Sequence, residues 1–213
     1  MAAGNPDGAH PHRCGRLVPG DGVCEDAAVE AAGRVEVIAG PMFAGKTEEL
    51  LRRVRRAAIG GRRVRVFSHR LDTRPGAERV ASHAGLAHPA RNVGTAAEIA
   101  GGVGDADLVA VDEAHFFGSR LIEVAGDLAD RGLVVVVAGL DVTFDGRPFE
   151  PLPSLMALAE RVDKLTAVCT VCGAEAIFHV RAEPSEVPAG IIDAEHVGGA
   201  EKYQARCRRH RRA

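Results

Sequence analysis

A glycine-rich octapeptide holds the first residues whose types and spacing indicate a chemistry. Residues 40–47 match the pattern G-x-x-x-x-G-K-[ST] at every fixed position and read Gly40-Pro41-Met42-Phe43-Ala44-Gly45-Lys46-Thr47. In such a loop, backbone N–H groups surround phosphate oxygens, a lysine adds positive charge at the β- and γ-phosphates, and a hydroxyl binds Mg²⁺. We therefore interpret all eight residues as a phosphate-binding loop, with Lys46 and Thr47 in the last two roles.

Two adjacent acids, Asp112 and Glu113, follow the apolar run at residues 107–111. The carboxyl ends of parallel strands are where open α/β sheets bind their ligands. An aspartate at that edge holds Mg²⁺ opposite the loop threonine. The neighbouring glutamate then remains free to accept a proton from the hydroxyl or water that attacks the γ-phosphate. We predict that Asp112 is the metal ligand and that Glu113 is the general base.

The same acids belong to a tetrad, Asp112-Glu113-Ala114-His115, that also spells the D-E-A-H box of nucleic-acid helicases. A helicase needs two α/β lobes, and a chain of 213 residues has room for one. The Ser-Ala-Thr expected after the next strand is absent, because residues 138–141 read Ala-Gly-Leu-Asp. These two observations disfavour a helicase.

Two short pairs near the carboxyl end predict a metal centre. Cys169 and Cys172 form a C-x₂-C pair, and Cys207 and His210 form a C-x₂-H pair. Three thiolates and an imidazole complete a closed tetrahedral zinc site, which leaves no position for water or substrate and is therefore structural. Residues 173–206 between the pairs exceed the usual ribbon spacing, so a loop is held between the two pairs. That loop carries Tyr203, which either covers a planar base or packs in a core.

The elements that must position these groups follow from the hydrophobic pattern. Apolar runs predict strands at residues 35–39, 63–68, 107–111 and 133–138. Helices are predicted to begin near Thr47 and Thr95 and to cover about residues 119–131 and 155–161. Residues 69–93 look like a long excursion with little periodicity. The alternation predicts an α/β fold of the P-loop NTPase type, a parallel sheet flanked by helices, with a small zinc-binding unit after about residue 163. We predict an N-terminal extension (1–33), an α/β domain (34–163) and a zinc-binding domain (164–213).

Composition limits the other possibilities. The net charge is −2, which gives no global attraction to nucleic acid, and no run approaches the ~20 apolar residues of a membrane span. The arginine-rich segments at 52–56, 62–65 and 206–212 are interpreted as solvated helix faces and a charged tail. No signal-peptide pattern opens the chain, so we expect a reducing cytoplasm, where paired cysteines favour metal over disulfide. Cys14 and Cys24, near His10 and His12, are interpreted as free thiols rather than as a second metal site.

From about Arg34 to His210 the chain resembles the type II thymidine kinases, the cytosolic zinc-containing kind. Beyond the glycine-rich loop, the resemblance is carried by Asp72-Thr73-Arg74, Ser82-His83-Ala84-Gly85-Leu86, Asp112-Glu113-Ala114-His115-Phe116-Phe117, Gly139-Leu140-Asp141-Val142-Thr143-Phe144 with Pro148-Phe149, Leu165-Thr166-Ala167-Val168-Cys169, and Val197-Gly198-Gly199-Ala200-Glu201-Lys202-Tyr203. Several motifs in the right order are far more specific than a glycine-rich loop alone.

The resemblance implies transfer of the γ-phosphate of ATP to the 5′-hydroxyl of thymidine, with deoxyuridine as a weaker substrate. Glu113 matches the catalytic carboxylate, and Asp72 and Arg74 match a pair near the phosphates. The apolar shell around the thymine corresponds to Met42, Phe116, Leu140, Phe144, Phe149 and Tyr203. Implied cofactors are ATP, Mg²⁺ and structural Zn²⁺, in a fold that joins a kinase domain to a zinc-bound lasso. The resemblance also implies a homotetramer and feedback inhibition by dTTP, with no membrane or nucleic-acid partner.

Two positions depart from the family pattern. His115 stands where the family often has Gln, and His179 stands where it often has a Thr near the base; we include His179 among the substrate contacts. The extension at residues 1–33 is unlike most members. Two other readings remain open: a regulatory ATPase whose zinc unit binds nucleic acid or a partner protein, and a homologue that binds thymidine without turnover.

Overall fold

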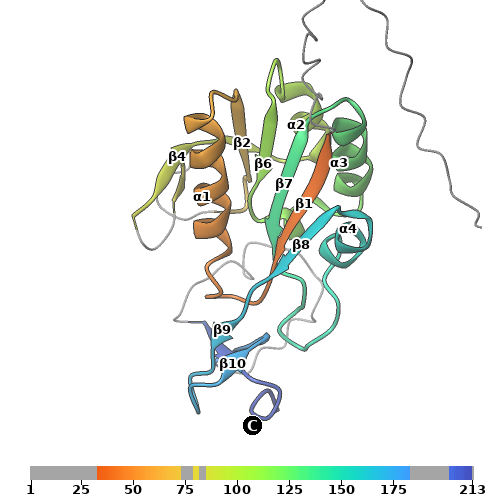
Figure 1. Ribbon diagram of the computed structural model, residues 1–213. Coiled ribbons are helices and arrows are strands. Elements are labelled where there is room, and N and C mark those ends of the chain that lie inside the picture. Colours follow the sequence, from red (N-terminus) through yellow and green to blue (C-terminus); the bar gives the residue numbers. More distant parts are fainter. Residues whose placement is uncertain (1–32, 73–78, 82–84, 183–201, 213) are drawn as a thin grey trace, which may run out of the picture. The chain divides into compact units, whose positions relative to one another are not determined.

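A parallel six-stranded sheet forms the centre of the computed structural model, which describes residues 33–72, 79–81, 85–182 and 202–212 (Figure 1). The strand order is β5-β2-β6-β7-β1-β8, and every pairing within the sheet is parallel. Its strands are β1 (Arg34–Ala39), β2 (Val64–His69), β5 (Arg91–Val93), β6 (Leu108–Val111), β7 (Val134–Gly139) and β8 (Arg161–Lys164). The predicted α/β fold with a parallel sheet is confirmed.

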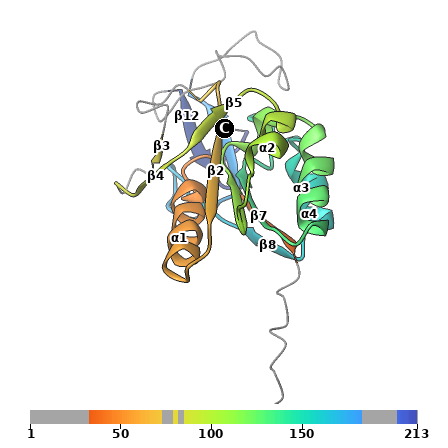
Figure 2. The same cartoon turned by 90° about the horizontal axis from the view of Figure 1, so that it is seen from above.

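Helices cover both faces of the sheet (Figure 2). One face carries α1 (Lys46–Ile59), whose Leu50 and Val54 pack with Ile38 of β1. The other face carries α2 (Ala96–Gly102), α3 (Arg120–Asp130) and α4 (Leu152–Leu158), which pack around Val37 and its neighbours. Adjacent residues of β1 thus face opposite layers, as the alternation of side chains along a strand requires. Burial on both faces explains why the central strands read as continuous apolar runs.

The short elements outside the central sheet include a strand pair beyond the carboxyl ends of the sheet strands and another beside α1 (Figure 1). A 3₁₀ helix, η1 (Ala114–Phe117), follows β6. Three antiparallel pairs are formed by β3 (Arg79–Ala81) with β4 (Ala87–Pro89), β9 (Ala167–Val168) with β10 (Glu175–Ala176), and β11 (Phe178–Arg181) with β12 (Tyr203–Arg206). We call the segment from Ala167 to Arg181 together with Lys202 to Arg212 the zinc unit.

The structure corrects two of the expected elements. The helix expected over residues 155–161 is α4, which begins and ends earlier, and Arg161–Lys164 is instead an edge strand that pairs with β1. Its polar, largely exposed side chains gave no apolar run to predict a strand. The excursion at residues 69–93 contains three short strands, β3 to β5. The boundaries proposed at residues 33 and 163 remain predictions, and residues 31–213 group into one compact unit. Cys14 and Cys24 lie outside the described residues.

A buried ion cluster joins α1 to the edge of the sheet. Arg53 of α1, 8% exposed, donates to Glu36 of β1 at 2.7 Å, to Asp163 of β8 at 2.5 Å and to Glu49 at 2.9 Å. Glu36 is 5% exposed and also accepts a hydrogen bond from Arg34 at 2.7 Å, so two arginines together satisfy this buried carboxylate. None of the described helices has the length and hydropathy of a membrane-spanning segment.

Replacing Arg53 with Ala is expected to lower the free energy of unfolding by about 3 kcal/mol, because the buried carboxylate of Glu36 loses one of its two cations and Glu49 and Asp163 lose their shared partner. Urea unfolding followed by circular dichroism measures the change. The neighbouring Arg52 is the matched control: its side chain is 52% exposed and pairs with Glu49, so Arg52→Ala should cost at most ~1 kcal/mol. Equal losses in the two variants would contradict the importance of the buried cluster.

Candidate active site and zinc centre

The glycine loop, residues 40–45, connects β1 to α1 with a strained backbone. Gly40, Phe43 and Gly45 have positive φ angles of 154°, 67° and 79°. A Cβ atom on Gly40 would lie 2.6 Å from the carbonyl oxygen of Leu165, so only glycine fits at that position. Lys46 Nζ donates to the Pro41 carbonyl at 2.7 Å, which folds the ammonium group back over the loop. A concave loop with a cation held across it has the form expected of a phosphate site.

Thr47 and Asp112 meet although 64 residues separate them in the chain. The Thr47 hydroxyl donates to Asp112 Oδ2 at 3.0 Å, and Asp112 is 2% exposed. They come together because β1 and β6 flank β7 and end at the same edge of the sheet. A hydroxyl and a carboxylate are the oxygen ligands that Mg²⁺ prefers, so this pair fits the predicted metal position.

Glu113 sits at a strained turn between β6 and η1. Its φ of 50° is in the left-handed region, which costs a non-glycine residue free energy. The turn leaves the side chain 20% exposed, while the adjoining Asp112 and Ala114 are buried. Strain of this kind is often found where a side chain must be directed into a site.

His115, on η1, is buried and organises the aromatic residues around it. Its Nδ1 accepts a hydrogen bond from the Leu140 N–H at 3.3 Å, which places the ring proton on Nε2. Nδ1 also lies 3.7 Å from Glu113 Oε2. The His115 ring centroid is 4.2 Å from that of Phe116 and 5.2 Å from that of Phe149. The structure therefore brings three predicted base contacts, Phe116, Leu140 and Phe149, around one imidazole.

Replacing His115 with Gln is expected to retain most of the protein's stability, because the amide oxygen can also accept from the Leu140 N–H. His115→Leu removes that acceptor and should lower the free energy of unfolding by about 1–3 kcal/mol. Thermal and urea unfolding of both variants measures the difference. Identical stabilities would show that the hydrogen bond to Leu140 contributes nothing.

The remaining predicted contacts are placed as follows. Tyr203 is 4% exposed, and its ring centroid lies 5.8 Å from that of His179 on the paired strand. The guanidinium of Arg181 lies 4.3 Å from the ring centroid of Phe144. Met42 lies half-buried in the glycine loop. Asp72 follows β2, its N–H donating to the His69 carbonyl, and Arg74 lies outside the described residues.

The four predicted zinc ligands converge. The ligand atoms of Cys169, Cys172, Cys207 and His210 all lie within 4.8 Å of one another. Zinc–sulfur bonds of ~2.3 Å in a tetrahedron put two sulfurs about 3.8 Å apart. The Cys172 and Cys207 sulfurs are 3.8 Å apart, and His210 Nδ1 lies 3.8 Å from Cys169 Sγ and 3.4 Å from Cys207 Sγ. The donor set and its spacing fit Zn²⁺.

The electrostatics around Cys169 favour a thiolate. Burial raises the pKa of this thiol, but hydrogen bonds from the backbone N–H groups of Cys207, Val171 and Cys172, and from the His210 ring, lower the pKa to about 5. A hydrogen bond from the backbone N–H of Ala174 lowers the pKa of Cys172, but burial and hydrogen bonds with the Cys169 and Cys207 thiols raise it further, so the net shift of the pKa is upward. An excess of negative charge shared among close sulfurs is what a divalent cation neutralises.

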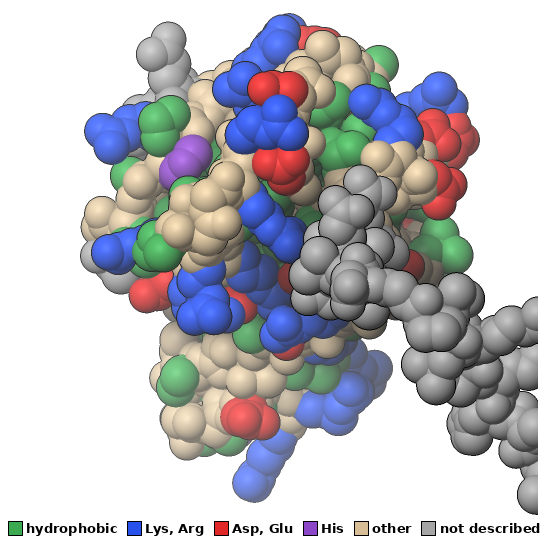
Figure 3. All heavy atoms as spheres, turned by 45° about the horizontal axis from the view of Figure 1, so that its top comes forward, with side chains coloured by type: hydrophobic (Ala, Val, Ile, Leu, Met, Phe, Trp, Pro, Cys, Tyr) green, Lys and Arg blue, Asp and Glu red, His purple; other side chains and the backbone are tan. Residues whose placement is uncertain are grey.

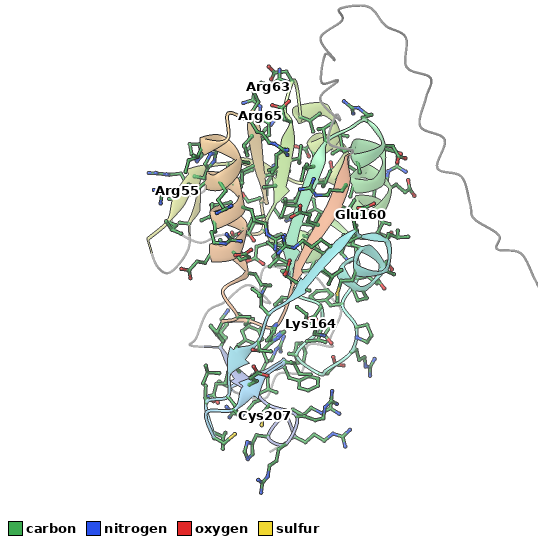
Figure 4. The ribbon with its side chains drawn as sticks, in the orientation of Figure 1. Arg55, Arg63, Arg65, Glu160, Lys164 and Cys207 are labelled. Carbon is green, nitrogen blue, oxygen red and sulfur yellow. The ribbon has the colours of Figure 1, made fainter. Side chains whose placement is uncertain are left out.

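The zinc unit packs directly on the glycine loop, a contact that sequence reasoning missed. Ala44 packs against the small core of the zinc unit, which consists of Ala167, Cys169, Ala176, Ala205 and Cys207. The Leu165 N–H donates to the Ala39 carbonyl at 2.8 Å. This hydrogen bond ties the residues just before the zinc unit to the end of β1. Lys164 Nζ lies 2.6 Å from Asp141 Oδ2, an ion pair across the same junction. Figure 4 shows Lys164 between the sheet and the part of the zinc unit that contains Cys207.

The arginine-rich segment at residues 62–65 lies away from this site. Arg63 and Arg65 lie at the end of the sheet opposite Cys207 (Figure 4), where they pair with Asp105 and Asp107. On the face seen in Figure 3, basic side chains lie next to acidic ones over much of the surface. For residues 62–65 this fits the interpretation of a solvated, ion-paired surface.

Comparison with known proteins places the chain in a family. The family model described as Thymidine kinase matches residues 33–211. A thymidine kinase of Deinococcus deserti is 46% identical over 192 residues, covering 84% of this chain and 95% of that protein. A thymidine kinase of Halobacterium salinarum is 46% identical over 186 residues, covering 85% and 95%. One from a Rhodothermus species is 45% identical over 179 residues, covering 84% and 81%. The chain that carries this glycine loop, this acid pair and this Cys₃His cluster therefore belongs to the thymidine kinase family.

Proposed function

We propose that the protein transfers the γ-phosphate of ATP to the 5′-hydroxyl of thymidine, giving ADP and dTMP for pyrimidine deoxynucleotide salvage. Deoxyuridine is the weaker second substrate. The observation that supports this most strongly is the meeting of Thr47 and Asp112 across the glycine loop, with Glu113 beside them and an aromatic cluster around His115. Membership of the thymidine kinase family supplies the nucleoside.

In this proposal the residues of the chain position the two substrates and neutralise the negative charge of the phosphates. The amides of the loop Gly40-Pro41-Met42-Phe43-Ala44-Gly45 surround the phosphates, and Lys46 leaves the Pro41 carbonyl to meet the γ-phosphate. Thr47 and Asp112 hold Mg²⁺, which supplies charge neutralisation at the β- and γ-phosphates when bound. Asp72 and Arg74 flank the phosphates. Glu113 accepts the proton of the 5′-hydroxyl as that oxygen attacks in line.

The thymine lies in an apolar shell closed by the zinc unit. The residues assigned to this shell are Met42, Phe116, Leu140, Phe144, Phe149, His179 and Tyr203. Zn²⁺, held by Cys169, Cys172, Cys207 and His210, acts only structurally by fixing the ends of the loop between the two pairs. Closing that loop over the substrates excludes water from the phosphate being transferred.

Regulation and assembly follow from the same proposal. The end-product triphosphate, dTTP, acts as a feedback inhibitor, and four copies associate into a homotetramer. Because three thiols must remain reduced to hold zinc, the cytoplasm is the proposed compartment.

The deciding experiment supplies purified protein with γ-labelled ATP, Mg²⁺ and a panel of nucleosides, and follows the label into nucleoside monophosphate. We expect label in dTMP, and less in dUMP. Label released as free phosphate and stimulated by nucleic acid would favour a regulatory ATPase instead. Thymidine binding in calorimetry without transfer would identify a catalytically silent homologue.

A further inference from the structure

His69, the last residue of β2, is buried and uses both nitrogens of its ring. The residue is 7% exposed. Its Nδ1 accepts a hydrogen bond from the Leu71 N–H at 3.1 Å, so the ring proton is on Nε2, which donates to the Gly94 carbonyl at 3.1 Å. Burial has the largest effect on the pKa of this ring and lowers it, so the ring is neutral at neutral pH and keeps this arrangement of donor and acceptor. The two hydrogen bonds together fix how the imidazole is oriented.

β2 ends beside the strand that carries the two acids of the site. β2 and β6 are neighbours in the sheet, and the Asp112 N–H donates at 2.9 Å to the carbonyl of Phe67, two residues before His69. Glu113 then begins the turn into η1. His69 therefore lies at the same edge of the sheet as the predicted metal position and the predicted base.

The ring of His69 packs against both phenylalanines of η1. Its centroid lies 4.7 Å from that of Phe117, in an edge-on arrangement, and 5.5 Å from that of Phe116. The Phe116 ring also contacts the imidazole of His115, which accepts the hydrogen bond from the Leu140 N–H that follows β7. The η1 turn is thus held from β2 through His69 and from β7 through His115.

The chain that follows β2 is tied to the same residue. The Leu71 N–H is bonded to the His69 ring, and the Asp72 N–H donates to the His69 carbonyl at 2.9 Å. Asp72 is assigned above to the phosphates, and Phe116 to the thymine. One buried side chain therefore contacts the turn that carries one of these residues and the segment that leads to the other.

We propose that His69 is a positioning residue for both substrates: its ring holds η1, with Glu113 and Phe116, and its Nδ1 holds the segment that leads to Asp72. This inference rests on the proposed function, because that function assigns these residues to the base and the phosphates. A purely structural role would lower stability without separating the two substrates.

The first substitution removes the hydrogen bonds and keeps a ring. His69→Phe retains an aromatic ring beside η1 but offers no acceptor to the Leu71 N–H. The loss of one ordinary hydrogen bond should raise the KM for ATP by ~10-fold. Both kcat and the KM for thymidine should stay within ~2-fold of the wild-type values, because the contact with η1 remains.

The second substitution removes the ring and keeps an acceptor. The amide oxygen of His69→Asn can still accept from the Leu71 N–H, but the side chain no longer reaches the rings of η1. We expect kcat for phosphate transfer to fall by ~10-fold and the KM for thymidine to rise by ~10-fold, because Glu113 and Phe116 lose their support. The KM for ATP should stay within ~2-fold of the wild-type value.

A double-mutant cycle tests the contact with η1 directly. Phe116→Leu is measured alone and together with His69→Asn, with kcat/KM for thymidine as the readout. If the two residues act through one contact, the combined loss should be smaller than the product of the two single losses by at least ~3-fold. Single losses that simply multiply would overturn the contact, and this cycle still decides if His69→Phe does not fold.

The controls separate this proposal from the proposed function. His88→Asn is the matched control, since His88 is a partly exposed histidine on β4 whose ring contacts the carbonyl of the adjoining Pro89. Its kinetic constants should equal those of the wild type. Melting temperature and zinc content verify that each variant is folded. Folded His69 variants with wild-type constants, or two variants that change the same constants, overturn the positioning role. Wild-type protein that binds ATP but phosphorylates no nucleoside overturns the proposed function instead.

Discussion

Replacing Glu113 with Gln is expected to lower kcat for phosphate transfer to thymidine by about 10²- to 10⁴-fold, because the amide cannot accept the proton of the attacking hydroxyl. The amide has nearly the same shape as the carboxyl group, so the strained turn at Glu113 should persist. The KM values for ATP and thymidine should therefore change little, and the loss should appear in kcat.

Steady-state kinetics of purified Glu113→Gln measure kcat and the two KM values separately. Isothermal titration of ATP and thymidine measures whether the variant still binds both substrates. Glu123→Gln is the matched control: that side chain is 63% exposed on α3, and its substitution should leave kcat unchanged. A Glu113→Gln enzyme with wild-type turnover would refute the role of Glu113 as the base. If both substrates also fail to bind, the turn itself has collapsed, and Glu113→Asp then tests whether a shorter base restores part of the rate.

Removing the zinc ion is expected to reduce kcat/KM at least ~100-fold and to weaken ATP binding, although no zinc ligand is assigned to either substrate. Structural zinc contributes about 10–16 kcal/mol to folding in small zinc-finger peptides, so the zinc unit should lose its packing without the ion. Ala44 of the glycine loop packs on the core of that unit, and the Leu165 carbonyl oxygen lies close to Gly40. Loss of structure in the zinc unit should therefore remove contacts that hold the glycine loop in place.

Cys172→Ser supplies the test, with zinc content by atomic emission, ATP affinity by fluorescence titration and thymidine kinase kinetics as readouts. Val171→Ser is the control, since Val171 is the adjacent residue, 55% exposed, and contributes no ligand. Re-addition of zinc to chelator-treated wild-type protein should restore activity. A zinc-free variant with normal ATP affinity and turnover would show that the two parts are energetically independent.

Much of the fold could be predicted from the chain because the central strands are buried on both faces. A run of valines such as residues 134–137 is typical of a strand whose two faces are both covered. β8 could not be predicted in the same way, because an edge strand needs an apolar pattern on one side at most. Its Arg161 and Asp163 are instead used in ion pairs, one of them with the buried Arg53. α4 begins earlier than predicted because Pro151 and Pro153 lie at its start, where a helix tolerates proline.

The candidate site shows the same division between local and long-range information. The glycine loop, the acid pair and the two metal pairs are each contiguous in sequence, so their residues could be named before their geometry was known. The packing of Ala44 on the zinc unit involves a residue more than a hundred positions away, and no local pattern encodes it. Whether the His179 Nδ1 has a hydrogen-bond partner likewise depends on which residues lie around β11 in the folded protein. The family resemblance predicts that His179 lies near the base, but the sequence could not indicate its hydrogen-bonding state.

The hydrogen bond from the Leu165 N–H to the Ala39 carbonyl limits how the enzyme can move. It joins the two chain segments at the point where one continues into the glycine loop and the other into the zinc unit. A change of the backbone angles at Leu165 would have to break this hydrogen bond and separate Leu165 from Gly40. The start of the zinc unit and the glycine loop are therefore coupled, and a displacement of one should be transmitted to the other.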